Sequence, residues 1–504
     1  MKIKRIAILV LLLVTFTAGS MIFMSNAGFE SPIIGDPETD ATTLTIVTRH
    51  DVTITDEFKS RFLATPEAVA AGITDIDFRY ATTDDGWKTY LENEALSVDI
   101  AWGGGPSLFN TMDNWGLLYH IDPVTDAELF TALNDSVPMT LAGAGMKKYA
   151  ADNLVWVASA ISSFGFTVNH DFLDQYGLPV PTTWEELATR TYYISDSVKA
   201  VSVGDPPLTT SNTRIYQIVL QAFGWEEGWK ILTRMGANAG IYPGSVDTRA
   251  AVVNGEVGIA MTIDFYGVIA HRENDACEYI IPDGQSIVNG DPIALAKNVD
   301  DYDEAVVFLK WVSGVEGQTA WMAEGLDRLP VNDSAFYTPE GSTHTELWAL
   351  YNETLDNEGI PFDEELATSN LDTTIYYWHN TIEQRHNLLR NTWGTLVTQF
   401  EDGDINATFY NELKNQIGVP CMTLNESIDW NTEYQTNSTF QAEKDAEWRI
   451  YAKDQYCDIL EALGEPCGTT PTTDPTDTPF AFIPAIMSTL FVATVTLIYR
   501  KKRK

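Results

Sequence analysis

Residues 98–109 read VDIAWGGGPSLF, a short apolar run followed by three consecutive glycines and then a Pro-Ser pair that begins a helical pattern. The run predicts a buried strand. The glycines allow a sharp turn that brings backbone N–H groups close to a ligand or to an opposing surface. A tight turn that only packs the helix on the strand is an equally good interpretation. The stretch contains neither a P-loop nor a Gly-x-Gly-x-x-Gly fingerprint, so it does not indicate a nucleotide enzyme.

Two further apolar runs precede this stretch, and each leads into a helical pattern. They are TLTIVTRHD at 43–51 and IDFRYAT at 76–82. Strands that alternate with helices are typical of βαβ units and a parallel sheet, in which ligands gather at the carboxyl ends of the strands. We therefore expect the loops TRHD, ATTDDG and GGGPS to share one edge of the sheet.

Both ends of the chain carry apolar segments next to basic residues. Residues 1–27 resemble a signal peptide or an N-terminal anchor, and either implies export. Residues 480–499 carry no charge and are long enough to span a bilayer as a helix. By the positive-inside rule the basic tail 500–504 is cytoplasmic, so the chain between the apolar segments lies outside the cell. The Thr/Pro-rich stretch 468–479 predicts an extended stalk.

The composition predicts a soluble exterior domain. The chain has 71 acidic and 31 basic residues and a formal net charge of −40, which excludes nucleic acid as a partner. Asn-x-Ser/Thr sequons are consistent with a glycosylated surface. They begin at Asn134, Asn332, Asn352, Asn406, Asn425 and Asn437.

The four cysteines favour a local disulfide over a zinc site. Cys421, Cys457 and Cys467 fall late in the chain, Cys277 lies far upstream, and no Cys-x-x-Cys occurs. Four cysteines allow three connectivities. We expect Cys421 to pair with Cys457 or Cys467.

Several stretches together resemble a known family. They are the opening glycine motif extended to 118, PTTWEEL at 181–187, and the segments at 238–267, 288–318 and 328–332. In this order they look like extracellular solute-binding proteins of ABC importers, and most like the cluster that binds ferric ion or small phosphorylated or anionic solutes. The resemblance runs from about residue 43 to residue 332. It implies an α/β, two-lobed periplasmic-binding-protein-like fold, here with a helical C-terminal extension and terminal membrane segments.

The resemblance also implies the domain organisation. Lobe one comprises 43–168 plus 286–332, and lobe two comprises 169–285. The strands that cross between the lobes are expected at 155–169 and 286–296.

Residues 333–467 follow as the helical extension. Within it, Ile375, Trp378, Ile382 and His386 form a helical stripe. We expect this stripe to pack on lobe one.

The clearest candidate site in lobe two is PPLTTSNTRIYQ at 206–217. Hydroxyl and amide residues at a helix start bind an oxyanion, and Arg214 adds a bidentate donor. An ordinary helix cap with a solvated Arg214 is the alternative. The candidate residues of this segment are Thr210, Ser211, Asn212, Thr213 and Arg214.

In lobe one, the resemblance places the glycine loop on the wall of the ligand cleft. The candidate ligand-binding residues there are His50, Asp84, Asp85, Gly103, Gly104, Gly105, Ser107 and Asp291.

The segment MTIDFYG at 261–267 bears on the choice between an anion and a metal. Ferric-binding relatives carry adjacent tyrosines here, because ferric iron prefers phenolate and carboxylate oxygens, whereas this chain has Phe265 before Tyr266. If the ligand is ferric ion, His50 and Tyr266 are its expected ligands, with Asp84 or Asp85. The missing phenolate favours an organic or phosphorylated anion, with Asp264 bonding ligand hydroxyls.

These observations predict a binding protein and no enzyme, because neither Gly-x-Ser-x-Gly nor His-Glu-x-x-His occurs. We expect a membrane-anchored receptor that captures a small anion, or ferric ion with an anion, and delivers it to ABC permease and ATPase subunits, with no cofactor. A ligand-sensing or adhesion protein with the same cleft is the alternative, followed by a secreted hydrolase.

Overall fold

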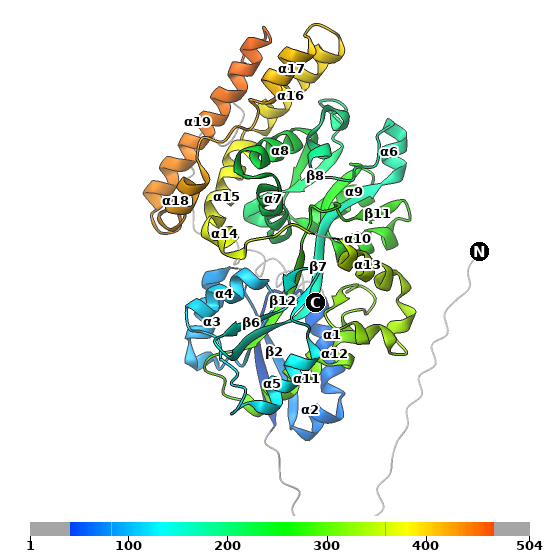
Figure 1. Ribbon diagram of the computed structural model, residues 1–504, viewed down its shortest axis with the longest axis vertical. Helices are drawn as coiled ribbons and strands as arrows, with labels where there is room; N and C mark the ends of the chain where they lie inside the picture. The colour runs from blue at the N-terminus through cyan, green and yellow to red at the C-terminus, as the bar shows by residue number, and fades with distance from the viewer. Residues whose placement is uncertain (1–40, 82, 358, 468–504) are drawn as a thin grey trace, which may run out of the picture. The chain divides into compact units, whose positions relative to one another are not determined.

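The computed structural model describes residues 41–81, 83–357 and 359–467, which form a two-lobed α/β fold (Figure 1). Its main sheet has the strand order β2-β1-β3-β12-β7-β10-β8-β9, and β6, β11 and β13 also pair with β7. The strands are β1 (Thr42–Thr48), β2 (Ile73–Tyr80), β3 (Ile100–Trp102), β6 (Lys147–Ala150), β7 (Asn153–Asn169), β8 (Val201–Gly204), β9 (Ala239–Tyr242), β10 (Ile259–Ile263), β11 (Cys277–Ile280), β12 (Val288–Leu295) and β13 (Leu329–Pro330). A separate pair consists of β4 (Thr140–Leu141) and β5 (Ala144–Gly145).

Lobe one is built on β1, β2, β3 and β12, and lobe two on β8, β9 and β10. The helices of lobe one are α1 (Val52–Leu63), α2 (Pro66–Ala70), α3 (Asp84–Glu92), α4 (Pro106–Asn114), α5 (Ala127–Ser136), α11 (Tyr302–Ser313) and α12 (Val315–Ala320). Those of lobe two are α6 (His170–Tyr176), α7 (Thr210–Phe223), α8 (Trp225–Asn238), α9 (Ser245–Val253) and α10 (Asp264–Glu273).

The strand β7 belongs to both lobes. Its first part pairs with β6, β12 and β13, and its last part pairs with β10 and β11. All of its residues after Asn153 are buried, which explains its nearly continuous apolar sequence. β7 and β12 occupy the stretches that the sequence predicts as crossing strands.

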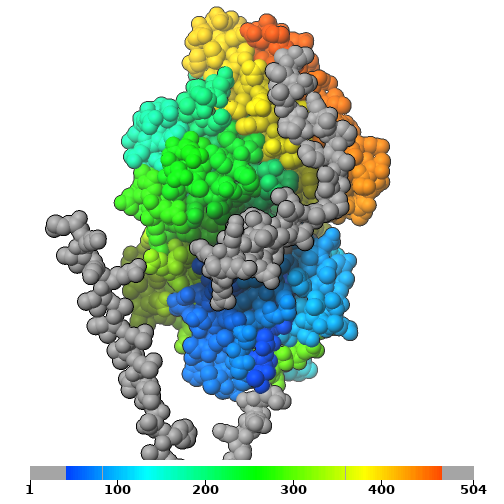
Figure 2. Space-filling model, turned by 180° about the vertical axis from the view of Figure 1, so that it is seen from behind, coloured from blue at the N-terminus to red at the C-terminus, as the bar shows by residue number. Residues whose placement is uncertain are grey.

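The C-terminal extension is helical, as predicted. It contains α13 (Thr345–Asp356), α14 (Glu364–Ser369), α15 (Leu371–Trp378), α16 (His386–Glu401), α17 (Ala407–Lys414), α18 (Leu424–Thr436) and α19 (Ser438–Ala462), with one π-helical segment at His379–Glu383. Figure 2 shows its later part, in yellow and orange, packed against lobe two.

The prediction that the stripe around Trp378 packs on lobe one is wrong. Trp378 stacks on Tyr216 of α7 at 5.0 Å, and both lie in the hydrophobic core of lobe two with Ile382. His386 Nε2 lies 3.1 Å from the carbonyl oxygen of Gly236 in α8. Within the described part of the extension, α13 and the short 3-10 turn Asp333–Tyr337 join the core of lobe one. A helical stripe reveals which face is buried but not which surface buries it.

The disulfide joins Cys457 and Cys467. A local disulfide in the extension is therefore confirmed, whereas the prediction that Cys421 takes part is wrong. Cys421 is half-buried and free, and Cys277 is buried and free. Cys457 lies in the last turns of α19 and Cys467 just beyond the helix, so the turn that ends α19 returns the second thiol to the first.

Helix capping accounts for several of the predicted sequons. The side chains of Asn332, Asn406 and Asn437 each accept a hydrogen bond from a backbone N–H two or three residues further on. These three asparagines therefore also serve as helix N-caps, a role that does not depend on glycosylation.

The predicted membrane segments fall outside the described residues, as do the stalk and the basic tail. Between residues 41 and 467, leaving out 82 and 358, no helix combines the length and the apolar character that a bilayer crossing requires.

Candidate functional site

The three predicted loops do share one edge of the sheet. β1 is parallel to β2 and to β3, with Thr48 opposite both Tyr80 and Trp102 at the ends of the strands. His50, the start of α3 and the glycine loop therefore follow neighbouring strand ends. Asp84 is the first residue of α3, and Asp85 beside it is exposed.

All three residues of the glycine loop need glycine. Gly103, Gly104 and Gly105 have φ values of 86°, 103° and 87°, which side chains rarely allow. A Cβ on Gly103 would also lie 2.7 Å from His50 Nε2. The N–H groups of Gly103 and Gly104 donate to Pro292 O at 2.8 Å and Asp291 Oδ1 at 3.1 Å. These two N–H groups are thus used within the protein, which supports the packing interpretation for this part of the loop.

A buried ion pair lies behind the glycine loop. Arg328 Nη1 is 2.8 Å from Asp291 Oδ2, and the two side chains are 8% and 12% exposed. Burial by itself raises the pKa of Asp291, but Arg328, His50 and the Gly104 N–H outweigh it and hold this pKa below its ordinary value. Asp291 is therefore a carboxylate that fixes the loop from the inside.

His50 lies in the same buried layer. Its ring packs edge-on against Trp102 and Trp321, with centroid distances of 4.6 and 5.3 Å. Nε2 is 3.7 Å from Asp291 Oδ2. Burial lowers the pKa of His50 to about 4 and outweighs the opposing effect of Asp291, so the ring is neutral at pH 7.

Asp264 connects α10 of lobe two to the crossing strand. Oδ2 accepts from the Ser163 N–H at 2.7 Å, and Oδ1 accepts from the Phe265 N–H at 2.8 Å. The carboxylate is 1% exposed, and burial raises its pKa to about 6 despite these hydrogen bonds. Both oxygens are thus committed to backbone donors.

Tyr266 lies at the same end of α10. Its ring is 4.3 Å from that of Phe265, and the Arg249 guanidinium is 5.6 Å from its centroid. Burial raises the pKa of the Tyr266 phenol, which favours the neutral form. Within the described part of the chain, no three or more His, Cys, Asp or Glu side chains are grouped so that they could hold a metal ion.

Two helix starts meet in lobe two and bring hydroxyl groups together. The Oγ atom of Ser245, the first residue of α9, is 2.6 Å from Thr209 Oγ1 and 2.6 Å from Ser211 Oγ at the start of α7. Free N–H groups and the helix dipole make such a place attractive to an anion. We call Thr209, Ser211 and Ser245 the hydroxyl cluster. Sequence reasoning found Ser211 but missed the other two, although Gly244-Ser245 before a helical pattern was an available signal.

The neighbouring candidates on α7 have structural partners. Asn212 is buried and accepts from the Gly204 N–H at 2.9 Å, and the Thr213 hydroxyl donates to Thr209 O at 2.6 Å. Thr210 is exposed. Asn212 and Thr213 thus hold the helix start in place, while Ser211 takes part in the hydroxyl cluster.

The structure brings Ser107 of lobe one to Arg214 of lobe two, and adds a third residue. Arg214 Nη2 donates to Ser107 Oγ at 3.0 Å, and Ser107 Oγ donates to Glu364 Oε2 at 2.5 Å. Arg214 Nη1 lies 3.1 Å from the same carboxylate oxygen. Sequence reasoning missed Glu364, because in DEEL it reads as an ordinary acidic residue in the first turn of a helix.

Comparison with known proteins identifies relatives among transport proteins. The phosphoglycerate transport regulatory protein PgtC of Salmonella typhimurium is 23% identical over 58% of this chain and 70% of its own length. Two solved structures share the fold at 16% identity. Apo ferric ion-binding protein A of Pasteurella haemolytica has a TM-score of 0.51 and covers 66% of this chain and 96% of its own. AfuA of Actinobacillus pleuropneumoniae, solved with fructose 6-phosphate, has a TM-score of 0.50 and covers 68% and 98%.

The family itself follows from a longer match. The model of the bacterial extracellular solute-binding proteins matches residues 57–349, more than half of the sequence and nearly all of both lobes. The structure supports that match, because the two solved structures named above share its fold. This chain therefore belongs to the bacterial extracellular solute-binding protein family.

Proposed function

We propose that this protein captures a small phosphorylated or carboxylated anion between its lobes and delivers it to the permease and ATPase of an ABC importer. The observation that carries the proposal is the hydroxyl cluster, where the first turns of α7 and α9 meet. Hydroxyl donors at two helix starts provide hydrogen bonds and a positive potential together, which suits a phosphate or carboxylate group.

Relatives support this ligand class. PgtC is named for phosphoglycerate transport, and AfuA was solved with fructose 6-phosphate. Phe265 in place of a second tyrosine weakens the case for ferric ion as the ligand. The site binds its ligand through hydroxyl and N–H donors, and no catalytic step is part of the proposal.

Removal of the hydroxyl cluster should weaken anion binding. We expect titration calorimetry to detect binding of 3-phosphoglycerate or D-fructose 6-phosphate, and none of spermidine, a cation. Ser211→Ala with Ser245→Ala should reduce the binding free energy by about 2 kcal/mol, since each hydrogen bond contributes roughly 1 kcal/mol. Ser438→Ala, at the start of α19, is the matched control. A coloured ferric complex that Tyr266→Phe abolishes and the double serine variant leaves intact would contradict the proposal.

We also propose that residues 480–499 anchor the protein in the cell membrane with the lobes outside. The basic run 500–504 and the Thr/Pro-rich stretch 468–479 support this arrangement. The full chain should sediment with membranes, whereas a chain ending at Thr470 should stay in the soluble fraction, as cell fractionation and immunoblotting can measure. Recovery of the full-length chain from the medium would contradict the anchor.

A further inference from the structure

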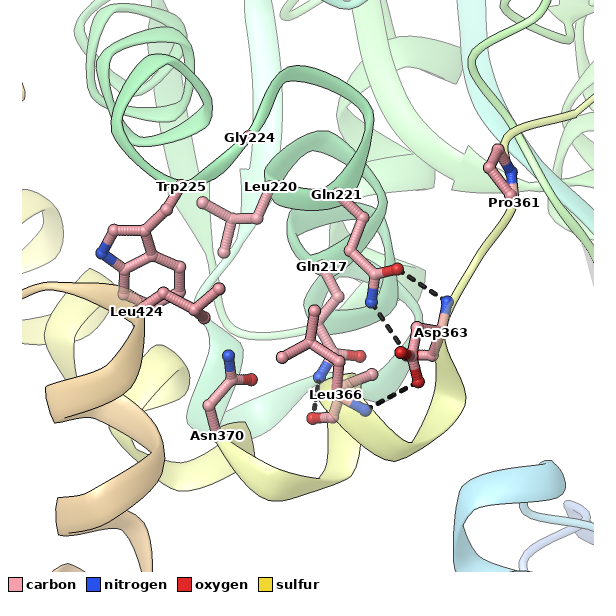
Figure 3. A pocket seen from close by; sticks show the side chains of 11 residues that line it. Gln217, Leu220, Gln221, Gly224, Trp225, Pro361, Asp363, Leu366, Asn370 and Leu424 are labelled. Carbon is pink, nitrogen blue, oxygen red and sulfur yellow. Dashed lines mark hydrogen bonds between the residues drawn. The ribbon is translucent and has the colours of Figure 1, made fainter.

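One face of α7 is covered by a segment of the C-terminal extension. Arg214, Gln217 and Gln221 are spaced three and four residues apart and therefore line one side of the helix. Gln221 Nε2 donates to Asp363 O at 2.9 Å, and the Asp363 N–H donates back to Gln221 Oε1 at 2.7 Å (Figure 3). Gln217 Nε2 donates to Ala367 O at 2.8 Å. We call residues 362–367 the strap. The backbone of the strap is thus bound to side chains of α7 in lobe two.

The strap presents Glu364 to Arg214. The two side chains are 27% and 12% exposed, and the Phe362 ring lies 4.9 Å from the guanidinium carbon of Arg214. The same Glu364 oxygen accepts from Ser107 at the start of α4 in lobe one. An arginine that sequence reasoning assigns to an anionic ligand therefore already has a carboxylate partner supplied by the chain itself.

The Glu364 carboxylate lies close to the candidate anion site, because its partner Arg214 is on the same helix as Ser211. Arg214 lies three residues after Ser211 on α7, so the two side chains are neighbours on one helix face, about one turn apart. The terminal nitrogens of Arg214 face Ser107 and Glu364, so an anion at the hydroxyl cluster would compete with Glu364 for the same guanidinium.

We propose that Glu364 is an internal competitor for the anion site: it occupies Arg214 and ties lobe two to Ser107 of lobe one until an anionic solute displaces it. The competition rests on the proposed function, whereas the tie between the lobes does not. The strap moves with lobe two, because Gln217 and Gln221 hold its backbone. Separation of the lobes must therefore break two contacts of Ser107, one with Glu364 and one with Arg214. Only molecules in the untied state bind the anion at full strength. The apparent Kd is therefore the intrinsic Kd divided by the untied fraction.

The test compares Glu364→Gln with Glu365→Gln in the full chain in detergent micelles. Both variants remove one carboxylate from α14, but Glu365 is exposed and no described residue pairs with it. Titration with 3-phosphoglycerate should give a Kd about tenfold lower for E364Q than for the wild type, and an unchanged Kd for E365Q.

A second readout examines the tie without any ligand. Fluorophores at Val124→Cys in lobe one and Tyr176→Cys in lobe two, both exposed positions, report the distance between the lobes in a Cys421→Ser background. E364Q should lengthen this distance in the ligand-free protein, and E365Q should not. An unchanged distance in E364Q overturns the tie. A longer distance with an unchanged Kd overturns the competition. If 3-phosphoglycerate and fructose 6-phosphate bind to none of the three chains, the proposed function and the competition both fail, and the distance alone decides the tie.

Discussion

Arg328→Met is expected to lower the free energy of unfolding by about 3–5 kcal/mol, because it leaves the Asp291 carboxylate buried without its charge partner. The two side chains are 2.8 Å apart and almost inaccessible, and the same carboxylate accepts from the Gly104 N–H. Loss of the pair should therefore also loosen the glycine loop. Urea denaturation followed by tryptophan fluorescence measures the change.

The double variant Arg328→Met, Asp291→Asn provides the control. It removes both charges, and Asn keeps an oxygen that accepts from the Gly104 N–H, so much of the lost stability should return. A double variant as unstable as Arg328→Met alone would show that the arginine acts through its packing against Trp321 and Phe265, whose ring centroids lie 5.0 and 5.2 Å from its guanidinium carbon, rather than through its charge.

Trp393→Ala should lower the free energy of unfolding by about 3–5 kcal/mol, because it leaves a cavity in the core. This side chain of α16 is fully buried in the core of lobe two, and its Nε1 donates to Asn238 Oδ1 at 2.8 Å. Asn238 in turn donates to the carbonyl groups of Leu187 and Thr189. The substitution therefore also disturbs a hydrogen-bond network in lobe two.

Calorimetry distinguishes a shared core from an independent appendage. Because the extension and lobe two bury their side chains against each other, Trp393→Ala should lower one common unfolding transition of both. Trp115→Ala, at a half-exposed tryptophan of lobe one, should change the free energy of unfolding by less than about 1 kcal/mol. Loss of the extension alone, with lobe two still unfolding at the wild-type temperature, would contradict the shared core.

Local patterns predicted the fold well. Alternation of apolar runs and helical stripes indicated the parallel strands β1, β2 and β3, and their loops lie at one edge as expected. The glycine triplet indicated a sharp turn, and all three residues adopt positive φ. The resemblance to a known family predicted the crossing strand at 155–169, and its nearly continuous apolar sequence fits a strand that is buried on both faces.

The partners of individual side chains were harder to predict. Cys457 pairs with Cys467 rather than with Cys421, and the stripe at Trp378 packs on lobe two rather than on lobe one. The first outcome depends on the turn that ends α19, and the second depends on how separate helices pack. A disulfide also requires two Cα atoms within a few ångströms, a distance that sequence spacing does not set.

The sequence by itself determined the elements of this protein, their order and the residue types at the site, because backbone propensity and hydrophobic period act over a few neighbouring residues. Its two lobes were predicted from the resemblance to a known family. Only the tertiary structure decided which groups of the site contact one another. It turned the amides of Gly103 and Gly104 inward, joined Ser245 to Ser211, and placed Glu364 on Arg214 from 150 residues further along the chain. Such contacts follow from how whole helices pack, and the free energy that selects one packing is spread over the entire core rather than written in the residues that meet.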